Sequence, residues 1–309
     1  MVNRTPTLGH LAAFLTIFIW ATTFVSIKVL LVDFSPVEIM VFRLVIAYVV
    51  LLIAKPRFFK SHSPKEELLF MLAGLSGVTL YSIFQNMALT YTFAANASVL
   101  ISISPFFIAI FAFFFLKDET QGLEFFIGFA IAILGIFLIS FNGRIELKLN
   151  PLGDLLSILA AVVWGVYSVT MKQISKLGYN NLLVTRRVFL YGTIIILPFL
   201  GLFKFQLGLE RFASLPNLLN MVFLGIAASA FCLASWNYAV GILGSVKTGI
   251  YIYIIPIITM LAAWLLLDER ITWMALLGVG LILLGLLISE GKVKLRPMDK
   301  GRRLMDGEK

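Results

Sequence analysis

The sequence predicts an all-α integral membrane protein with ten transmembrane helices, arranged as two inverted five-helix repeats. Three observations support this fold class: an apolar composition, ten apolar segments of membrane-spanning length, and an internal repeat. The chain has 309 residues, of which 60% are hydrophobic and 13% charged, and its mean hydropathy is +0.99. Soluble domains average roughly 45–50% apolar and 25% charged residues. A chain this apolar therefore needs a lipid environment.

Ten segments are long enough to cross a bilayer. A hydrocarbon core of about 30 Å needs about 20 helical residues at a rise of about 1.5 Å each. The first apolar segment has no cleavage signal before or within it, so we expect a retained helix rather than a signal peptide. The expected spans are 8–31, 35–54, 68–90, 95–116, 121–140, 152–172, 180–202, 216–238, 245–267 and 272–290.

The distribution of Lys and Arg predicts that both termini are cytoplasmic, because cytoplasmic loops carry an excess of positive charge. With the N-terminus inside, 16 of the 25 Lys and Arg residues fall in inner segments, six in outer segments and three within spans. Seven of the 16 lie in residues 291–309, which we expect to be a basic cytoplasmic tail beside anionic lipid. This distribution of positive charge indicates a multi-pass protein of the plasma or inner membrane. The net charge of +9 is therefore explained without nucleic acid, and no nucleic-acid partner is expected.

Residues that are rare in membrane spans recur at a spacing of 144 to 151 positions. The matching pairs are Trp20 with Trp164, Lys28 with Lys172, Arg43 with Arg187, Asn86 with Asn237, Pro105 with Pro256 and Glu119 with Glu269. We expect one repeat in residues 1–141 and the other in 152–290. Each repeat holds five spans, an odd number, so the second enters the membrane from the opposite side. Inverted repeats are typical of secondary transporters with a substrate site near the midplane, although channels can also be built in this way.

These residues resemble the EamA-type members of the drug/metabolite transporter superfamily, over residues 8–290. The resemblance rests on the segments 20–28 and 164–172, on Arg43 and Arg187, and on a fourth helix with a central proline that ends in Leu-Lys-Asp-Glu or Leu-Leu-Asp-Glu. It implies a ten-helix transporter of amino acids, other metabolites or drugs. It does not identify the substrate, because fold and function are separable.

The candidate substrate site is a cavity near the membrane midplane. Trp20 and Trp164 each lie 12 residues into a helix, about 18 Å deep at a rise of about 1.5 Å per residue. Tryptophans at membrane interfaces lie much nearer to the helix ends. An alternative is that these side chains fill the helix bundle and hydrogen-bond between helices. The candidate substrate-binding residues are Trp20, Thr23, Tyr81, Gln85, Ser98, Ser102, Trp164, Tyr167, Trp236 and Tyr253.

Arg43, Arg187, Glu119 and Glu269 are candidate gating residues. An arginine in the hydrocarbon core costs roughly 2.5–3.5 kcal/mol on insertion scales, so each is expected to have a partner. Inversion brings Arg43 to the level of Glu269 and Arg187 to the level of Glu119. Two such ion pairs, formed alternately, would latch the outer and the inner gate. Alternatively, each acid caps the next helix, and each arginine bonds to carbonyl groups or reaches the interface.

Prolines and glycines predict local helix geometry. Pro105 and Pro256 lie inside spans, where a proline frees a carbonyl group and allows a kink. Gly128 and Gly135 lie seven residues apart on one helix face, as do Gly278 and Gly285. This spacing of small residues predicts close packing of the fifth and tenth spans.

The residue inventory favours transport over catalysis. The span interiors carry no Asp, Glu or His, so neither a metal, another cofactor nor a buried proton relay is expected. We expect an exporter of small organic solutes that works by alternating access around the midplane cavity. A passive channel or facilitator of the same fold is the alternative. An intramembrane enzyme is less favoured because no nucleophile and base lie together. The expected partners are a small-molecule substrate and the lipid bilayer, with monomer and homodimer both left open.

Overall fold

The structure is a computed structural model that describes residues 6–92, 94–116, 118–119, 121–141, 150–201, 203, 205–259, 261 and 273–289. Within these ranges every regular element is helical. Seven helices of the described chain are long and apolar enough to cross a membrane, and three shorter apolar helices accompany them. The predicted fold class, all-α and membrane-embedded, is confirmed. Glu269 and the basic tail, residues 291–309, lie outside the described residues.

The described spans follow one another in the order that the internal repeat predicts. The first half contains α1 (Pro6–Leu30), α2 (Pro36–Ala54), α3 (Pro64–Ala73), the π-helix η1 (Gly74–Leu80), α4 (Tyr81–Tyr91), α5 (Ala94–Ile101), α6 (Ser104–Phe115) and α7 (Leu123–Phe141). The second half contains α8 (Pro151–Ser175), α9 (Asn181–Ile196), α10 (Leu215–Phe223), the π-helix η4 (Leu224–Phe231), α11 (Cys232–Leu243), α12 (Ser245–Gly249), the 3₁₀-helix η5 (Ile250–Ile254) and α14 (Trp273–Ser289). Two short 3₁₀-helices, η2 (Leu197–Phe199) and η3 (Leu209–Ala213), lie between α9 and α10.

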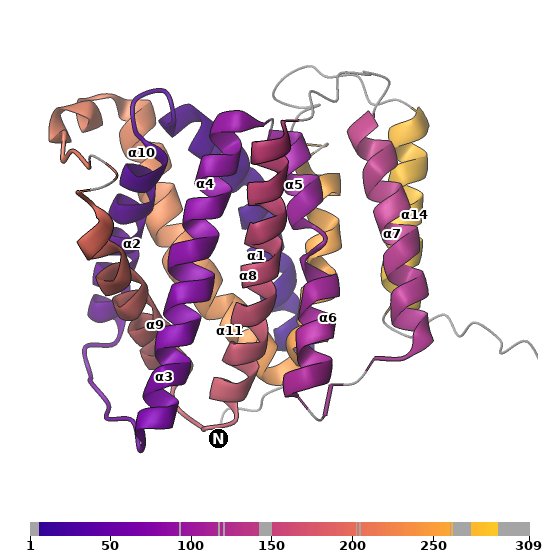
Figure 1. Cartoon of the computed structure of the whole chain (residues 1–309), viewed down its shortest axis with the longest axis horizontal. Coiled ribbons are helices and arrows are strands. Elements are labelled where there is room, and N and C mark those ends of the chain that lie inside the picture. Colours follow the sequence, from indigo (N-terminus) through magenta and orange to yellow (C-terminus); the bar gives the residue numbers. More distant parts are fainter. Residues whose placement is uncertain are drawn as a thin grey trace, which may run out of the picture.

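The two halves run in opposite directions through the bundle. The N-terminus and the start of α1 lie at one end of the bundle, whereas α8 begins at the other end (Figure 1). We call these ends the N-terminal face and the opposite face. The structure therefore shows the inverted arrangement that an odd number of spans per repeat requires.

Capping residues define several helix starts. Ser35 caps α2 in a capping box with Glu38, and Ser63 caps α3. Asn150 and Asn180 accept the first N–H groups of α8 and α9. Such side chains satisfy N–H groups that have no partner within the helix.

The fourth and ninth spans are broken near their prolines. In the fourth, α5 ends at Ile101 and α6 begins at Ser104, with Pro105 in its first turn. In the ninth, the 3₁₀-helix η5 comes directly before the segment that contains Pro256. Since proline cannot donate the hydrogen bond that a continuous helix needs, interruptions of the helix are expected at both places, and the kinks that the prolines allow stay a prediction.

The helices α7 and α14 pack side by side at one edge of the bundle (Figure 1). A Cβ atom on Gly128 would lie 2.5 Å from the carbonyl oxygen of Gly285, and one on Gly135 would lie 2.5 Å from that of Gly278. The crossed pairing means that the two helices are antiparallel and nearly touch through their backbones. The predicted close packing of the fifth and tenth spans is confirmed.

Candidate substrate site

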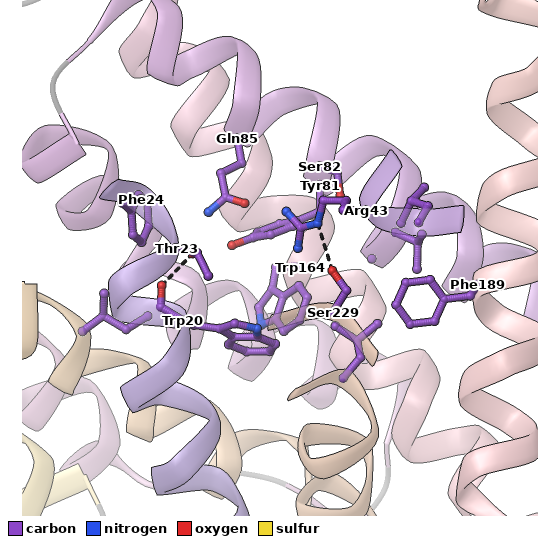
Figure 2. Close-up of a pocket in the computed structure, with 15 residues that line it drawn as sticks. Trp20, Thr23, Phe24, Arg43, Tyr81, Ser82, Gln85, Trp164, Phe189 and Ser229 are labelled. Atoms are coloured by element: carbon purple, nitrogen blue, oxygen red, sulfur yellow. Dashed lines mark hydrogen bonds between the residues drawn. The ribbon is translucent and has the colours of Figure 1, made fainter. Parts of the chain in front are cut away.

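A cavity in the middle of the bundle is lined by residues from both halves (Figure 2). Its volume is about 40 Å³. This is room for about three water molecules at roughly 10–15 Å³ each. The helices α1, α2 and α4 and the π-helix η1 contribute from the first half, and α8, α9, η4 and α11 from the second. The α7–α14 pair contributes none of the lining residues.

Half of the predicted substrate-binding residues line this cavity. Trp20, Thr23, Tyr81, Gln85 and Trp164 do so, and all five are labelled in Figure 2. Gln85 and Thr23 are each 4% exposed, so their polar groups face the interior of the bundle rather than lipid. The Thr23 hydroxyl donates to the carbonyl oxygen of Trp20, one turn earlier in α1, at 2.7 Å.

Three tryptophans form a cluster at the cavity wall. The rings of Trp20 and Trp164 meet edge to face, with centroids 5.2 Å apart and planes at 85°. Trp236 packs behind both, with centroids 5.2 and 5.8 Å away. Trp20 Nε1 donates to the carbonyl oxygen of Ala228 at 2.9 Å, whereas Trp164 Nε1 is buried without a partner among the described residues. The cluster thus joins the two halves by an aromatic contact and a hydrogen bond.

The other five predicted substrate-binding residues are not among the residues that line the cavity. Tyr167 packs against Trp164 at 4.9 Å, and its hydroxyl donates to Asn237 Oδ1 at 2.6 Å. Trp236 and Tyr253 are fully buried. The Ser102 hydroxyl donates to the carbonyl oxygen of Ser98 within its own span, at 2.7 Å. In this structure Tyr167, Trp236 and Tyr253 pack inside the bundle, and Ser102 bonds within its own span.

Arg43 was predicted as a gating residue but lines the cavity. Its side chain is 8% exposed, and its Nε donates to Ser229 Oγ at 2.9 Å. Ser229 belongs to the π-helix η4, and Gly77, another lining residue, belongs to η1. The π-helices occupy equivalent places in the two repeats, and such wide turns are frequent at functional sites.

Sequence reasoning missed the remaining nine lining residues. Ser229 and Ser82 are polar, but isolated serines are common in membrane spans and carry no signal of their own. The apolar positions are indistinguishable in sequence from the other apolar residues of their helices. The missed lining residues are Phe24, Leu44, Gly77, Val78, Ser82, Phe189, Ser229, Leu233 and Ile255.

The structure does not bring Arg187 and Glu119 together. Arg187 instead pairs with Glu67 of α3 at 2.8 Å and donates to the carbonyl oxygen of Phe59 at 2.9 Å. The hydroxyl of Tyr191 also bonds to Glu67. Arg187 therefore pairs across the two halves at the N-terminal face, but with a different carboxylate from the one predicted.

Glu119 caps a helix of the other half. Its carboxylate accepts from the backbone N–H groups of Ser245 and Val246, at 2.9 and 3.1 Å, and lies 3.8 Å from Lys172 Nζ. It therefore caps α12 rather than the next helix along the chain, α7. The neighbouring Asp118 is exposed and pairs with Lys176 at 2.7 Å, and this hydrogen bond lowers the pKa of Asp118.

A second pocket lies toward the N-terminal face. It is formed by the ends of α8 and α11 and the start of α9, and Asn237, Asn181 and Ser175 are among its polar lining residues. Asn237 also accepts the hydrogen bond from Tyr167, and a Cβ on Gly77, in the wall of the central cavity, would lie 2.1 Å from the Tyr167 ring. The Tyr167 side chain therefore spans the layer between the two pockets. Within the described ranges no three His, Cys, Asp or Glu side chains gather as metal ligands would.

The inverted all-helical fold and the cavity between its halves define a membrane transporter of a known class. The model of the EamA-like transporter family matches residues 7–141 and 151–290, one match in each half. The chain belongs to the EamA-like transporter family, which is a family of transporters rather than enzymes.

Named relatives are similar over nearly their whole length. An uncharacterized transporter of Archaeoglobus fulgidus is 30% identical, covering 92% of this chain and 97% of its own. A probable terminal-alkyne amino-acid exporter of Streptantibioticus cattleyicolor is 29% identical, covering 90% and 91%. A probable amino-acid metabolite efflux pump of Escherichia coli is 25% identical, covering 90% and 93%.

A crystal structure of another protein supports the fold. It superposes with a TM-score of 0.69, covering 92% of this chain and 97% of its own, at 19% sequence identity. At this identity the similarity shows the shared architecture alone.

Proposed function

We propose that this transporter exports small organic solutes, such as amino acids and related metabolites, by alternating access around the central cavity. The observation that carries the proposal is the position of the cavity, between two inverted halves and beside Trp20 and Trp164. Two relatives named as exporters of amino acids or their metabolites support the substrate class and the direction. The excess of Lys and Arg in the segments at the N-terminal face favours a cytoplasmic location for that face, in a plasma or inner membrane.

The second pocket supports a route toward the cytoplasm. It lies between the central cavity and the N-terminal face, and the Tyr167–Asn237 hydrogen bond crosses the layer that separates the two spaces. Rotation of Tyr167 would open this layer without unfolding a helix. In the proposed cycle a solute enters through the second pocket, passes Tyr167 and occupies the central cavity.

Ion pairs between the halves supply the gates of the proposed cycle. At the N-terminal face, Arg187 of α9 pairs with Glu67 of α3. At the opposite face, Arg211 of η3 pairs with Glu38 of α2 at 2.8 Å. We propose that residues 1–141 and 152–290 are the two moving units. Opening one face would break the pair at that face and keep the pair at the other.

Counterflow in proteoliposomes tests this function. Purified protein should exchange a labelled solute from a panel of amino acids and metabolites for the same unlabelled solute, with saturation. A channel would conduct without saturation and without stimulation from the far side, and an enzyme would release a new product. Either result would contradict the proposed carrier.

The site has its own test. Trp20→Ala and Trp164→Ala should each abolish counterflow while leaving a folded, membrane-inserted protein. Normal transport by both variants would place the site elsewhere. Trp273→Ala is a matched control, because Trp273 is 71% exposed at the start of α14 and outside the cavity.

A further inference from the structure

Arg43 differs from Arg186, Arg187 and Arg211 because it has no acid or carbonyl partner among the described residues. Arg187 pairs with Glu67, and Arg211 pairs with Glu38. Arg186 donates to the carbonyl oxygens of Lys55 and Arg57. Arg43 instead donates a hydrogen bond to a neutral hydroxyl group, that of Ser229.

Most hydrogen-bond donors of Arg43 are left for the cavity. A guanidinium group has five N–H donors in a planar fork. The Nε–H of Arg43 is used by Ser229, and the Nη groups make no hydrogen bond to the described residues. Figure 2 shows the guanidinium beside the Tyr81 ring, and Arg43, Tyr81 and Gln85 all line the cavity.

Three carboxylates near the ends of the described spans are engaged elsewhere. Glu38 accepts from Arg211, Glu67 from Arg187, and Glu119 from the start of α12. The internal repeat explains the difference between the two equivalent arginines. With the spacing of 151 that relates Asn86 to Asn237, Glu67 of the first half corresponds to Leu218, and its neighbour Glu66 to Asn217. Arg187 thus finds an acid at the third span of the other half, and Arg43 does not.

An unpaired positive charge in the middle of a membrane is costly and is a functional site by default. We propose that Arg43 binds the carboxylate of the transported solute, with Trp20 and Trp164 contacting the solute's apolar part. This inference rests on the proposed transport function and specifies its substrate class. The fork of a guanidinium matches a carboxylate with two parallel hydrogen bonds. A singly charged carboxylate neutralises one guanidinium, whereas doubly charged phosphate would leave a net charge in the apolar site.

Matched acids and amides test the proposal on purified protein. The probes are isovalerate with isovaleramide, and L-leucine with L-leucinamide, with inorganic phosphate and chloride alone as further arms. Binding is followed by tryptophan fluorescence, since Trp20 and Trp164 line the site and Trp236 packs against both, and by the shift of the melting temperature. The wild type should bind isovalerate and leucine and should bind neither amide. Stronger binding of phosphate or chloride than of both acids would assign the site to another anion and overturn the proposal.

Three variants test whether Arg43 is responsible for the preference for acids over amides. Arg43→Gln should weaken acid binding by at least about thirtyfold, because truncating one partner of a buried charge pair typically costs that much. Arg43→Lys keeps the charge and should retain part of the affinity, which also shows that the position tolerates replacement. Arg186→Gln makes the same change at an arginine outside the cavity and should keep the full preference for acids.

Several outcomes would overturn the proposal. They are equal binding of acid and amide by the wild type, an unchanged acid preference in Arg43→Gln, an equal loss in Arg186→Gln, or no binding of any acid up to about 10 mM. Glu269 lies outside the described residues, so Glu269→Gln is a further check. If acid binding emerged only in that variant, Glu269 would be the partner of Arg43 and the proposal would fail. Counterflow separates the two proposals. A wild type that exchanges amides as well as acids would remain a transporter but lose the inferred substrate class, whereas a wild type that binds acids without counterflow would lose only the transport cycle.

Discussion

Trp20 and Trp164 occupy equivalent positions in the two halves, but their indole N–H groups have different surroundings. Trp20 Nε1 donates to the carbonyl oxygen of Ala228, whereas Trp164 Nε1 is buried without a partner among the described residues. Trp20→Phe removes a hydrogen bond worth about 1 kcal/mol, and Trp164→Phe removes a donor that is already unsatisfied. We therefore expect the melting temperature in detergent to fall more for Trp20→Phe than for Trp164→Phe. The reverse order would contradict the hydrogen bond to η4.

The partners of Arg187 and Glu119 make a second prediction at the residue scale. Arg187→Glu places two carboxylates together at the N-terminal face, beside Glu67, and should reduce transport and thermal stability. Adding Glu67→Arg should restore both, because it recreates the pair with its charges exchanged. Adding Glu119→Arg should not, because Glu119 caps α12 and lies near Lys172. Rescue by Glu119→Arg, without rescue by Glu67→Arg, would favour the latch predicted from the sequence.

Single residues differ in how far the sequence reveals them. A tryptophan or an arginine deep in a span is rare enough to stand out, and Trp20, Trp164 and Arg43 all line the cavity. The partner of Arg187 was not predictable, because Glu67 lies in the first turns of α3 and several acids lie near helix ends. Ser229 was missed because its role depends on the π-helix that turns it toward Arg43.

At the scale of helices, the glycines of α7 and α14 make a paired prediction. A methyl group on Gly285 would lie 2.5 Å from the carbonyl oxygen of Gly128, whereas one on Gly280 meets nothing within 4 Å. Overpacking of this kind costs about 1–3 kcal/mol. Gly285→Ala should therefore lower the melting temperature, and Gly280→Ala, on the same helix, should leave it unchanged or raise it. Equal effects of both variants would contradict the backbone contact.

The helices also show which features of the sequence predict local helix geometry. The breaks near Pro105 and Pro256 were predictable, because proline removes a hydrogen-bond donor whatever its neighbours are. The π-helices η1 and η4 were not, because a residue added to a helical turn leaves no mark in composition or hydrophobicity. Both π-helices border the cavity, so the missed geometry is the geometry that shapes the site.

For the whole molecule, the inverted repeat predicts opposite locations for two loops. A reporter after Lys309 should be cytoplasmic, and one inserted beside Asn150 should be external, because five spans separate the two ends of each repeat. The measurement is the activity of reporters that work on one side of the membrane only. Finding both reporters on one side would contradict the odd number of spans.

The fold of the whole chain was more predictable than its substrate. Ten apolar segments predict ten helical spans, because lipid requires every span to satisfy its backbone hydrogen bonds internally. The recurrence of rare residues at a similar spacing predicts the two inverted repeats. The substrate depends on a few side chains and on the shape between them. Arg43 illustrates the limit: its position was evident, but whether it meets a carboxylate of the protein depends on residues 217 and 218, far along the chain.

The charge of Arg43, which has no acid partner among the described residues, also makes the proposed cycle sensitive to voltage. When the cavity opens to one side, Arg43 is at the electrical potential of that side, so alternation moves its charge through part of the membrane field. A full crossing is worth about 2.3 kcal/mol per 100 mV. An interior-negative membrane would therefore draw the empty carrier toward its inward-open state, where an exporter collects its cargo. A bound carboxylate without an ammonium group cancels the charge, and a carrier loaded with it would then turn outward without opposing the field, whereas a zwitterionic amino acid would leave one positive charge to move.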